Sequence, residues 1–239
     1  GSALDAAKSI ALVAAQSEDF DLWTMEEGRK DWMSTSAPLP TVAIPTTAGT
    51  GSEVSRSTVV LNEETGRKVI ITHPGMLPGI VIADPELTIG LPAHITSATG
   101  MDALAHCLEA YCSPFHNPMC DGVALEGMRL IREHLRDAVT DGTDMVARAQ
   151  IMAAASMGAV AFQKGLGAIH AMSHPVSALY DSHHGLTNAV AMPYVLMRNR
   201  TAIEDKLTRI SSYLGLSDKP AHGFEVFVNW TLELRDCFE

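Results

Sequence analysis

The chain has 239 residues, 46% of them hydrophobic, and is long enough to bury a core in one large domain or two modest ones. Its 17 basic residues stand against 28 acidic ones, giving a net charge of −11 with no cluster of Lys or Arg, which argues against nucleic acid as a partner. No apolar run reaches the roughly 18 to 20 residues that span a bilayer, and no signal core follows the N-terminus, so we expect neither a membrane protein nor a secreted one.

The cysteines are scattered along the sequence. They are Cys107, Cys112, Cys120 and Cys237, and no two of them have Cys-x-x-Cys spacing. This spacing argues against a zinc–thiolate site and against a thioredoxin-type pair. Scattered cysteines suit a reducing compartment, and we predict a cytoplasmic protein.

The first third of the chain combines helix and strand patterns. Apolar residues at helical spacing predict a helix over 3–15, with Ser2 as its N-cap. Four short β-rich runs follow, at 41–45, 57–61, 68–72 and 79–83. A turn separates the second run from the third, which is typical of a β-hairpin. We therefore predict an α/β fold for this part.

After Pro92 the composition changes to long stretches rich in Ala, Met and Leu, without strand signals. Helical periodicity covers 94–111, 119–137, 144–162, 187–215 and 222–235. Another helix carries His170 and His174, and Pro175 is predicted to kink or end it. We therefore place a domain boundary near Leu91, with an α/β part at 1–91 and an all-helical part at 92–239.

A glycine-rich loop follows the first predicted strand. The segment Thr46 to Glu53 reads Thr-Thr-Ala-Gly-Thr-Gly-Ser-Glu and offers small residues, backbone N–H groups and hydroxyls to a phosphate. Taken alone, such a loop is more often a plain turn. It matches neither a Walker A sequence nor the Gly-x-Gly-x-x-Gly fingerprint, so phosphate binding here requires another scheme.

Two short blocks contain the potential metal ligands. Asp102 and His106 are four residues apart in an apolar helical stretch, so both lie on one face of the helix. Alone, such a pair is more often a hydrogen bond or a salt bridge. The second block holds four of the ten histidines within fifteen residues, namely His170, His174, His183 and His184. One carboxylate with several imidazoles and no thiolate predicts a site for Fe(II), Zn(II), Ni(II) or Mn(II), with an open position for a substrate oxygen.

Four stretches of the chain together resemble the iron-containing, or group III, alcohol dehydrogenase family. They are Gly1 to Lys8, Thr46 to Glu53, Gly100 to Glu109 and His170 to Pro193. Their order and gaps are highly specific, and the similarity extends over essentially the whole chain. The resemblance implies a dehydroquinate synthase-like architecture, with a partial dinucleotide-binding α/β domain at 1–91 and a helical metal-binding catalytic domain at 92–239. It also weakens the alternative that Gly1 and Ser2 are the scar of a purification tag.

The resemblance implies roles for individual residues. The metal ligands would be Asp102, His106, His170 and His184, with His183 as a neighbour. The residues that contact NAD or NADP would be Gly1, Ser2, Asp5, Thr46, Thr47, Thr50 and Lys68. His174 would face the nicotinamide as the catalytic histidine, unless it only makes a structural hydrogen bond. Phe162 would line the substrate pocket, unless it is a core aromatic residue.

The implied activity is hydride transfer between a primary or secondary alcohol and a nicotinamide cofactor. The metal, Fe(II) or else Zn(II) or another divalent ion, would act as a Lewis acid. The partners would be the alcohol or aldehyde and further copies of the chain in a homo-oligomer. Open alternatives are a metal-assisted hydrolase with Glu109 as its base, a metal-binding fragment without turnover, and a related dehydrogenase or lyase of the same architecture. Glu109 more often fills a structural role in such a sequence.

The resemblance also predicts that the chain is truncated at both ends. Members of the family carry an α/β segment ahead of the Gly-Ser turn, which supplies further strands of the sheet, and more helices after the position of residue 239. Without the missing strands, an apolar and unpaired edge of a parallel sheet is expected.

Overall fold

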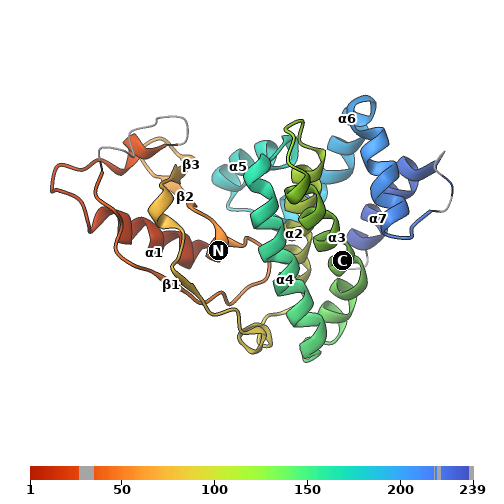
Figure 1. Ribbon diagram of the computed structural model, residues 1–239, viewed down its shortest axis with the longest axis horizontal. Helices are drawn as coiled ribbons and strands as arrows, with labels where there is room; N and C mark the ends of the chain where they lie inside the picture. Colours follow the sequence, from red (N-terminus) through yellow and green to blue (C-terminus); the bar gives the residue numbers. More distant parts are fainter. Residues whose placement is uncertain (27–34, 218, 220–221, 237–239) are drawn as a thin grey trace.

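The computed structural model describes residues 1–26, 35–217, 219 and 222–236. Cys237, one of the four cysteines, lies outside the described part. An α/β part lies on one side of a larger helical part (Figure 1). Its regular elements are α1 (Ser2–Val13), β1 (Val42–Ala43), β2 (Ser57–Asn62), β3 (Arg67–Thr72) and β4 (Ile80–Val81). Short 3-10 turns join them, namely η1 (Leu22–Met25), η3 (Ser52–Val54), η4 (Pro74–Met76) and η5 (Pro85–Thr88).

The strands form two small sheets. β2 and β3 pair antiparallel from Ser57 opposite Thr72 to Asn62 opposite Arg67, which confirms the predicted hairpin. β1 and β4 pair in parallel, with Val42 opposite Ile80. A small core of Leu12, Met25, Val69, Ile71 and Met76 joins α1 to the hairpin.

The parallel pair leaves apolar side chains exposed to solvent. The exposed residues on and beside its strands are Val42, Ile44, Ile80, Val81 and Ile82. Parallel strands are normally buried on both faces, so a pair with this much exposed apolar surface is unusual. The exposure agrees with the expectation that this sheet has an unpaired apolar edge.

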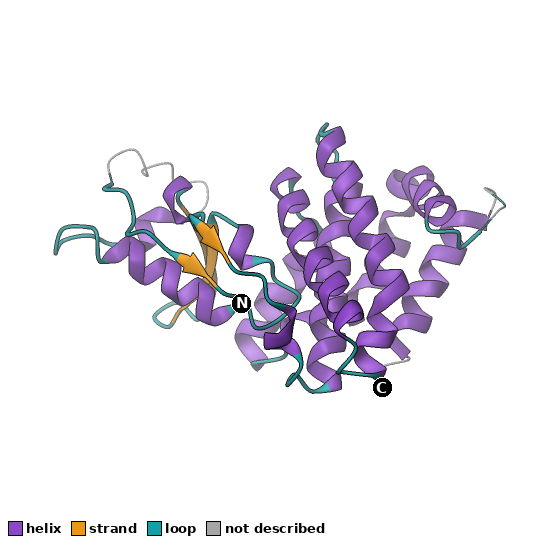
Figure 2. Cartoon of the chain, turned by 60° about the horizontal axis from the view of Figure 1, so that its bottom comes forward, coloured by secondary structure: helices purple, strands orange, loops and turns teal. Residues whose placement is uncertain are grey.

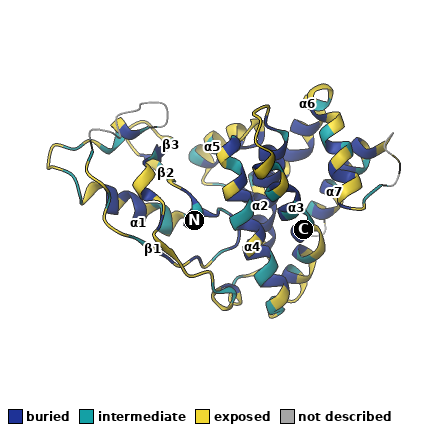
Figure 3. Ribbon diagram, viewed as in Figure 1, coloured by how far each residue is buried: buried dark blue, intermediate teal, exposed yellow. Residues whose placement is uncertain are grey.

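The rest of the described chain is helical (Figure 2). The helices are α2 (Ala93–Cys112), α3 (Pro118–Thr140), α4 (Met145–Ala161), α5 (Ala168–Tyr180), α6 (His184–Tyr213) and α7 (Gly223–Asp236), with the turn η6 (Phe162–Lys164) between α4 and α5. Every residue of α2 from Thr96 to Tyr111 is buried, because α3, α4 and α6 all contact it (Figure 3). A helix covered on all sides needs small or apolar residues around its whole circumference, which explains its Ala-rich sequence. The predicted fold class, an α/β remnant followed by an all-helical part, is confirmed.

Two predicted helix starts are wrong, and Pro175 does not end its helix, which is one of the two outcomes predicted there. Ser2 is the first helical residue and Gly1 holds the N-cap position, because the Asp5 N–H already donates to the Gly1 carbonyl. Pro175 lies inside α5, which continues to Tyr180. The carbonyl that loses its partner there belongs to the exposed Ala171, where water can replace the missing N–H. α6 begins at His184, three residues before the predicted start.

The stretch Met145–Lys164 is long and apolar enough to cross a membrane by length and composition, contrary to the expectation from the sequence. Half of it is buried inside the fold, as is typical of a core helix. The buried Arg148 in its first turn donates to the Thr96 hydroxyl over 2.7 Å and to the Gly142 carbonyl over 3.0 Å. Both the burial and these bonds indicate a helix that packs within the protein.

A buried lysine ties α1 to the loop and strand that follow the glycines. The Lys8 ammonium is almost fully enclosed and donates to the carbonyls of Ser52, Ser55 and Ser57 over 2.7 to 2.9 Å. These carbonyls belong to η3, its C-cap and the start of β2. One side chain therefore holds three backbone groups in place.

We expect Lys8→Met to lower the free energy of unfolding by about 3 kcal/mol, since it leaves three carbonyls without this donor and each unsatisfied buried group costs about 1 to 3 kcal/mol. Urea denaturation followed by circular dichroism measures this change. Lys219→Met, at an exposed lysine, is the matched control and should change stability by less than about 0.5 kcal/mol. Equal stability of the two variants would contradict the role of Lys8.

Candidate metal and cofactor site

Four side chains from α2, α5 and α6 converge at one point. The Nε2 atoms of His106, His170 and His184 lie 3.9, 3.7 and 3.7 Å from Oδ1 of Asp102. Two atoms bound to one ion by bonds of about 2.1 Å are about 3.0 to 3.4 Å apart. The observed separations from Oδ1 are slightly wider. The ligand atoms of Asp102, His106 and His170 also lie within 4.8 Å of one another, so these three residues form the compact part of the candidate site, and His184 adjoins it through its contact with Asp102.

The helix positions explain this convergence. Asp102 and His106 are one turn apart on α2, and His170 lies in the first turn of α5. His184 is the first residue of α6, and the glycine after it lets α6 approach α2. A Cβ at Gly185 would overlap the Ala98 carbonyl oxygen and lie 3.2 Å from the Asp102 Cβ. The absence of a side chain at Gly185 therefore brings His184 to Asp102.

Each of two histidines is oriented by a second partner on its other ring nitrogen. Nδ1 of His170 lies 2.7 Å from Oε2 of Glu109, and Nδ1 of His184 lies 3.3 Å from Oγ of Ser173. The second oxygen of Glu109 accepts the backbone N–H of Ile169 over 2.7 Å. With a proton on Nδ1 facing Glu109, the Nε2 lone pair of His170 faces Asp102, which is the tautomer a metal ligand needs.

Burial and close charges shift the pKa values of these groups. Burial opposes charge on Asp102, but His106 beside it, the hydrogen bond to His170 and the charge of His184 hold the pKa of its carboxyl well below the usual range. Burial lowers the pKa of His106 and of His184 to about 4. Burial also opposes charge on His170, but hydrogen bonds to Asp102 and Glu109 raise its pKa to about 9. His106 and His184 are therefore neutral near pH 7, whereas a cation that binds Nε2 of His170 must displace a proton from that ring.

One buried atom of this cluster supports the fit to a divalent ion. Within the described residues, Oδ1 of Asn188 has no hydrogen-bond partner, and its amide group lies against Oδ1 of Asp102. Buried polar atoms are rarely left unsatisfied, and the binding of an ion is one common reason for an exception. The donor set of one carboxylate oxygen and three imidazole nitrogens suits Fe(II) or Zn(II). The chemistry of the residues therefore fits the metal implied by the sequence.

We expect Glu109→Gln to weaken Zn(II) binding about 10- to 100-fold, the usual effect of losing a partner that orients a ligating histidine. The amide still offers an oxygen to Ile169 but no longer provides a carboxylate for the His170 ring. Competition with a chromophoric chelator measures the affinity. Glu126→Gln is the control, since that carboxylate pairs with Arg129 on the surface of α3. An unchanged affinity for Glu109→Gln would refute the orienting role.

The glycine-rich loop lies against the helices that carry the four candidate ligands, Asp102, His106, His170 and His184, which we call the metal cluster. A Cβ at Gly49 would be 2.7 Å from the Cβ of Thr99, one turn before Asp102 on α2. Gly51 has a left-handed backbone (φ +59°), and a Cβ there would overlap Ala159 of α4. These glycines are thus required by close packing, whether or not a phosphate binds. The packing also places the loop directly beside the metal cluster.

The predicted cofactor-binding residues fall into one group and one outlier. Gly1 adjoins Thr50, since a Cβ on Gly1 would be 2.8 Å from its methyl group, and Asp5 accepts the Ser52 hydroxyl over 2.5 Å. Ser2 and Thr46 are exposed, and Thr47 is partly exposed, on the same segments. Lys68 lies apart on β3 and donates to Oγ of Ser177 on α5 over 2.7 Å. Both carboxylate oxygens of Asp5 are engaged within the protein, the second by the Val59 N–H over 3.0 Å.

His174 and Phe162 both adjoin the cluster. The His174 ring lies 5.1 Å from the ring of His184 and 6.0 Å from that of His170. Burial, with His184, His170 and Lys68 nearby, lowers the pKa of His174 to about 4. Phe162 packs 5.0 Å from the His106 ring. His183, by contrast, is exposed at the N-cap of α6.

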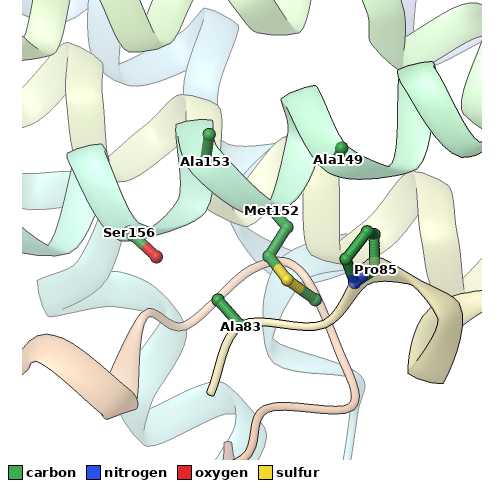
Figure 4. Close-up of a pocket in the computed structure, with 6 residues that line it drawn as sticks. All are labelled: Ala83, Pro85, Ala149, Met152, Ala153 and Ser156. Carbon is green, nitrogen blue, oxygen red and sulfur yellow. The ribbon is translucent and has the colours of Figure 1, made fainter. Parts of the chain in front are cut away.

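A separate pocket of about 170 Å³ lies between α4 and the segment after β4 (Figure 4). Its lining is mostly apolar and consists of Ala83, Pro85, Ala149, Met152, Ala153 and Ser156. The Ser156 hydroxyl donates to the buried Glu53 over 2.8 Å, which connects this pocket to the glycine-rich loop. None of the four predicted ligands lines it, so it is distinct from the metal cluster.

The sequence analysis does not predict the contacts that two residues of the cluster make in the structure. Glu109 is predicted either as a structural residue or as a hydrolytic base, whereas it orients His170. Asn188 is not predicted at all, although its position four residues after His184 on a helix is the same spacing that joins Asp102 to His106. The prediction of a divalent metal with a nicotinamide cofactor agrees with this cluster beside a glycine-rich loop.

One carboxylate and three imidazoles, held by buried helices beside such a loop, form a candidate metal site next to a candidate cofactor loop. Comparison with known proteins identifies the family of the chain. The profile described as "Fe-containing alcohol dehydrogenase family, C-terminal" matches residues 96–234, and that described as "Iron-containing alcohol dehydrogenase" matches residues 1–85. The chain belongs to the iron-containing alcohol dehydrogenase family, which confirms the resemblance.

Individual relatives agree with this assignment. The chain is 42% identical to a 4-hydroxybutyrate dehydrogenase of Cupriavidus necator, over 91% of this chain and 59% of that protein. It is 39% identical to an NAD-dependent methanol dehydrogenase of Bacillus methanolicus, over 90% of this chain and 55% of that protein. The crystal structure of a 1,3-propanediol oxidoreductase superposes with a TM-score of 0.91 at 37% identity, covering 98% of this chain and 61% of that one. The chain thus spans between half and two thirds of the length of these relatives.

Proposed function

We propose that this chain carries the metal centre and part of the cofactor site of an NAD(P)-dependent alcohol dehydrogenase. The reaction is hydride transfer between a primary or secondary alcohol and the nicotinamide. The observation that supports it most strongly is the convergence of three Nε2 atoms on Oδ1 of Asp102, directly beside the loop that Gly49 packs against α2. In this proposal Asp102, His106, His170 and His184 are the ligands.

A divalent ion held by Asp102, His106, His170 and His184 would supply Lewis-acid polarisation of the substrate oxygen, and a bound nicotinamide would supply the hydride acceptor or donor. The residues of the chain position these groups and exclude water. Phe162 covers one side of the His106 ring, and the buried α2 keeps Asp102 away from solvent. Electrostatic interactions at a site with little water are stronger than in solution, so the attraction between the Asp102 carboxylate and a bound cation is weakened little by solvent.

His174 is the proposed proton acceptor. It is partly exposed, stands beside His170 and His184, and is neutral at pH 7 because its pKa is lowered to about 4. A neutral imidazole can take the hydroxyl proton as the alcohol is oxidised. Gly1, Ser2, Thr46, Thr47 and Thr50 are proposed to contact the phosphates and ribose of the cofactor, with Asp5 near the nicotinamide and Lys68 at a ribose hydroxyl.

The hydrolase alternative is less well supported by the contacts of Glu109. One of its oxygens faces Nδ1 of His170 and the other accepts the Ile169 N–H. A carboxylate engaged on both oxygens, on the far side of the His170 ring from the other ligands, is poorly placed to activate a water at the ion. The three relatives described above are dehydrogenases or oxidoreductases, which also favours hydride transfer.

The deciding experiment is calorimetric titration of NAD into the anaerobic Fe(II)-loaded protein, followed by nicotinamide absorbance with added alcohols. We expect saturable binding and a rise in reduced nicotinamide. Folded, metal-loaded protein that does not bind NAD would contradict the proposed cofactor site in this chain. Cytoplasmic location and assembly into a homo-oligomer are part of the same proposal, and size-exclusion chromatography with light scattering tests the second.

A further inference from the structure

Asn188 is a fully buried polar residue at the centre of the metal cluster. It lies one turn after His184 on α6, with no exposed surface. Its amide nitrogen is 2.8 Å from Oδ1 of Asp102, 3.3 Å from Nε2 of His170 and 3.3 Å from Nε2 of His184. The side chain therefore contacts three of the four proposed ligand atoms at once.

This arrangement leaves hydrogen-bonding capacity unused. An amide group carries two N–H hydrogens, so it cannot donate to all three of these atoms together. Its oxygen, Oδ1, has no hydrogen-bond partner among the described residues. An unsatisfied buried amide oxygen costs about 1 to 3 kcal/mol. Such an oxygen beside a cluster of ligands points to a missing positive partner.

A bound cation would reverse which end of the Asn188 amide group is favoured beside the ligand atoms. The Nε2 lone pairs of His170 and His184 would then be committed to the ion and unable to accept from Asn188. The N–H end of an amide carries partial positive charge and is repelled by a cation, whereas the carbonyl oxygen is a good ligand for a divalent ion. Half a turn about the Cβ–Cγ bond exchanges the two atoms without changing the shape of the side chain.

We propose that Asn188 is a fifth residue of the metal centre and that its amide turns over when the cation binds, so that Oδ1 faces the ion. In the metal-free protein the amide nitrogen instead faces Oδ1 of Asp102 and the Nε2 atoms of the two imidazoles. This inference rests on the proposed metal centre. It adds a residue whose role is separable from those of the four ligands.

The first test follows the amide directly in the whole chain. With ¹⁵N-labelled asparagine, the side-chain resonance of Asn188 is assigned by its loss in Asn188→Asp and is followed during Zn(II) titration. We expect it to shift strongly at one equivalent, while the buried Asn62, on the distant hairpin, stays unchanged. Retention of the metal-free Asn188 resonance in Zn(II)-saturated protein would overturn the proposal.

The second test uses two variants of similar shape. Asn188→Leu removes both polar atoms and should weaken Zn(II) binding about 10- to 100-fold, by analogy with the loss of other groups that support metal ligands. Asn188→Asp keeps an oxygen in either orientation and should retain or tighten binding. If Asn188 only donates to Asp102, Asn188→Leu should instead bind Zn(II) at least as tightly as the parent, because removal of the donor frees Oδ1 of Asp102 for the ion.

Co(II) absorption gives a readout that is independent of affinity. The visible spectrum of the Co(II)-loaded protein should change in Asn188→Leu, since the ion loses an oxygen, and should remain similar in Asn188→Asp. Identical spectra and affinities for parent and Asn188→Leu would refute the role of Asn188 alone. Failure of the parent to bind Zn(II) would refute the metal centre itself, so the two proposals fail distinguishably.

Discussion

The variant His170→Ala is expected to lose its metal on purification and to bind Zn(II) more weakly by well over 100-fold. That figure exceeds the 10- to 100-fold typical of residues that only support a ligand, because His170 supplies a ligand atom itself. It also leaves Glu109 buried without the ring that it contacts over 2.7 Å. Metal content by mass spectrometry and affinity by chelator competition measure the loss.

His183→Ala is the matched control for this experiment. His183 is adjacent to His184 in sequence, yet it is exposed at the N-cap of α6 and is not among the proposed ligands. The variant should retain full metal occupancy. Full occupancy in His170→Ala, in a protein whose circular dichroism matches the parent, would show that the ligand assignment is wrong.

A single methyl group at Gly185 is expected to damage both stability and metal binding. The added Cβ of Gly185→Ala overlaps the Ala98 carbonyl oxygen of α2, and neither backbone can move without shifting a helix. Overpacking of this kind typically costs about 1 to 3 kcal/mol. Because the shift moves His184 away from Asp102, we also expect Zn(II) affinity to fall at least 10-fold, as it does when a group that positions a ligand is lost.

The same substitution at Gly122 separates this effect from the general consequences of replacing a helical glycine. Gly122 is exposed on α3, and a Cβ there would meet no atom within 4 Å. Gly122→Ala should therefore stabilise the protein by about 0.5 to 1 kcal/mol and leave Zn(II) affinity unchanged. Thermal unfolding and chelator competition on both variants test the pair. Equal effects would mean that Gly185 is not a contact point between α2 and α6.

Much of the helical part could be predicted from the sequence, because long periodic stretches carry a strong local signal. The helices predicted over 94–111, 119–137 and 144–162 differ from α2, α3 and α4 by a few residues at most. The effect of Pro175 is not encoded locally, since it depends on whether water can reach the carbonyl one turn earlier. That accessibility is a property of the fold.

The sequence by itself determined which residue types can bind a metal, because Asp102 and His106 are one helical turn apart and four histidines crowd into fifteen positions. It did not determine how these blocks meet. Only the tertiary structure joined Glu109 to His170 and Asn188 to Asp102, pairs that are 61 and 86 residues apart. The physical reason is that side-chain convergence depends on how closely helices approach, and the approach of α6 to α2 is set by the missing side chain of Gly185.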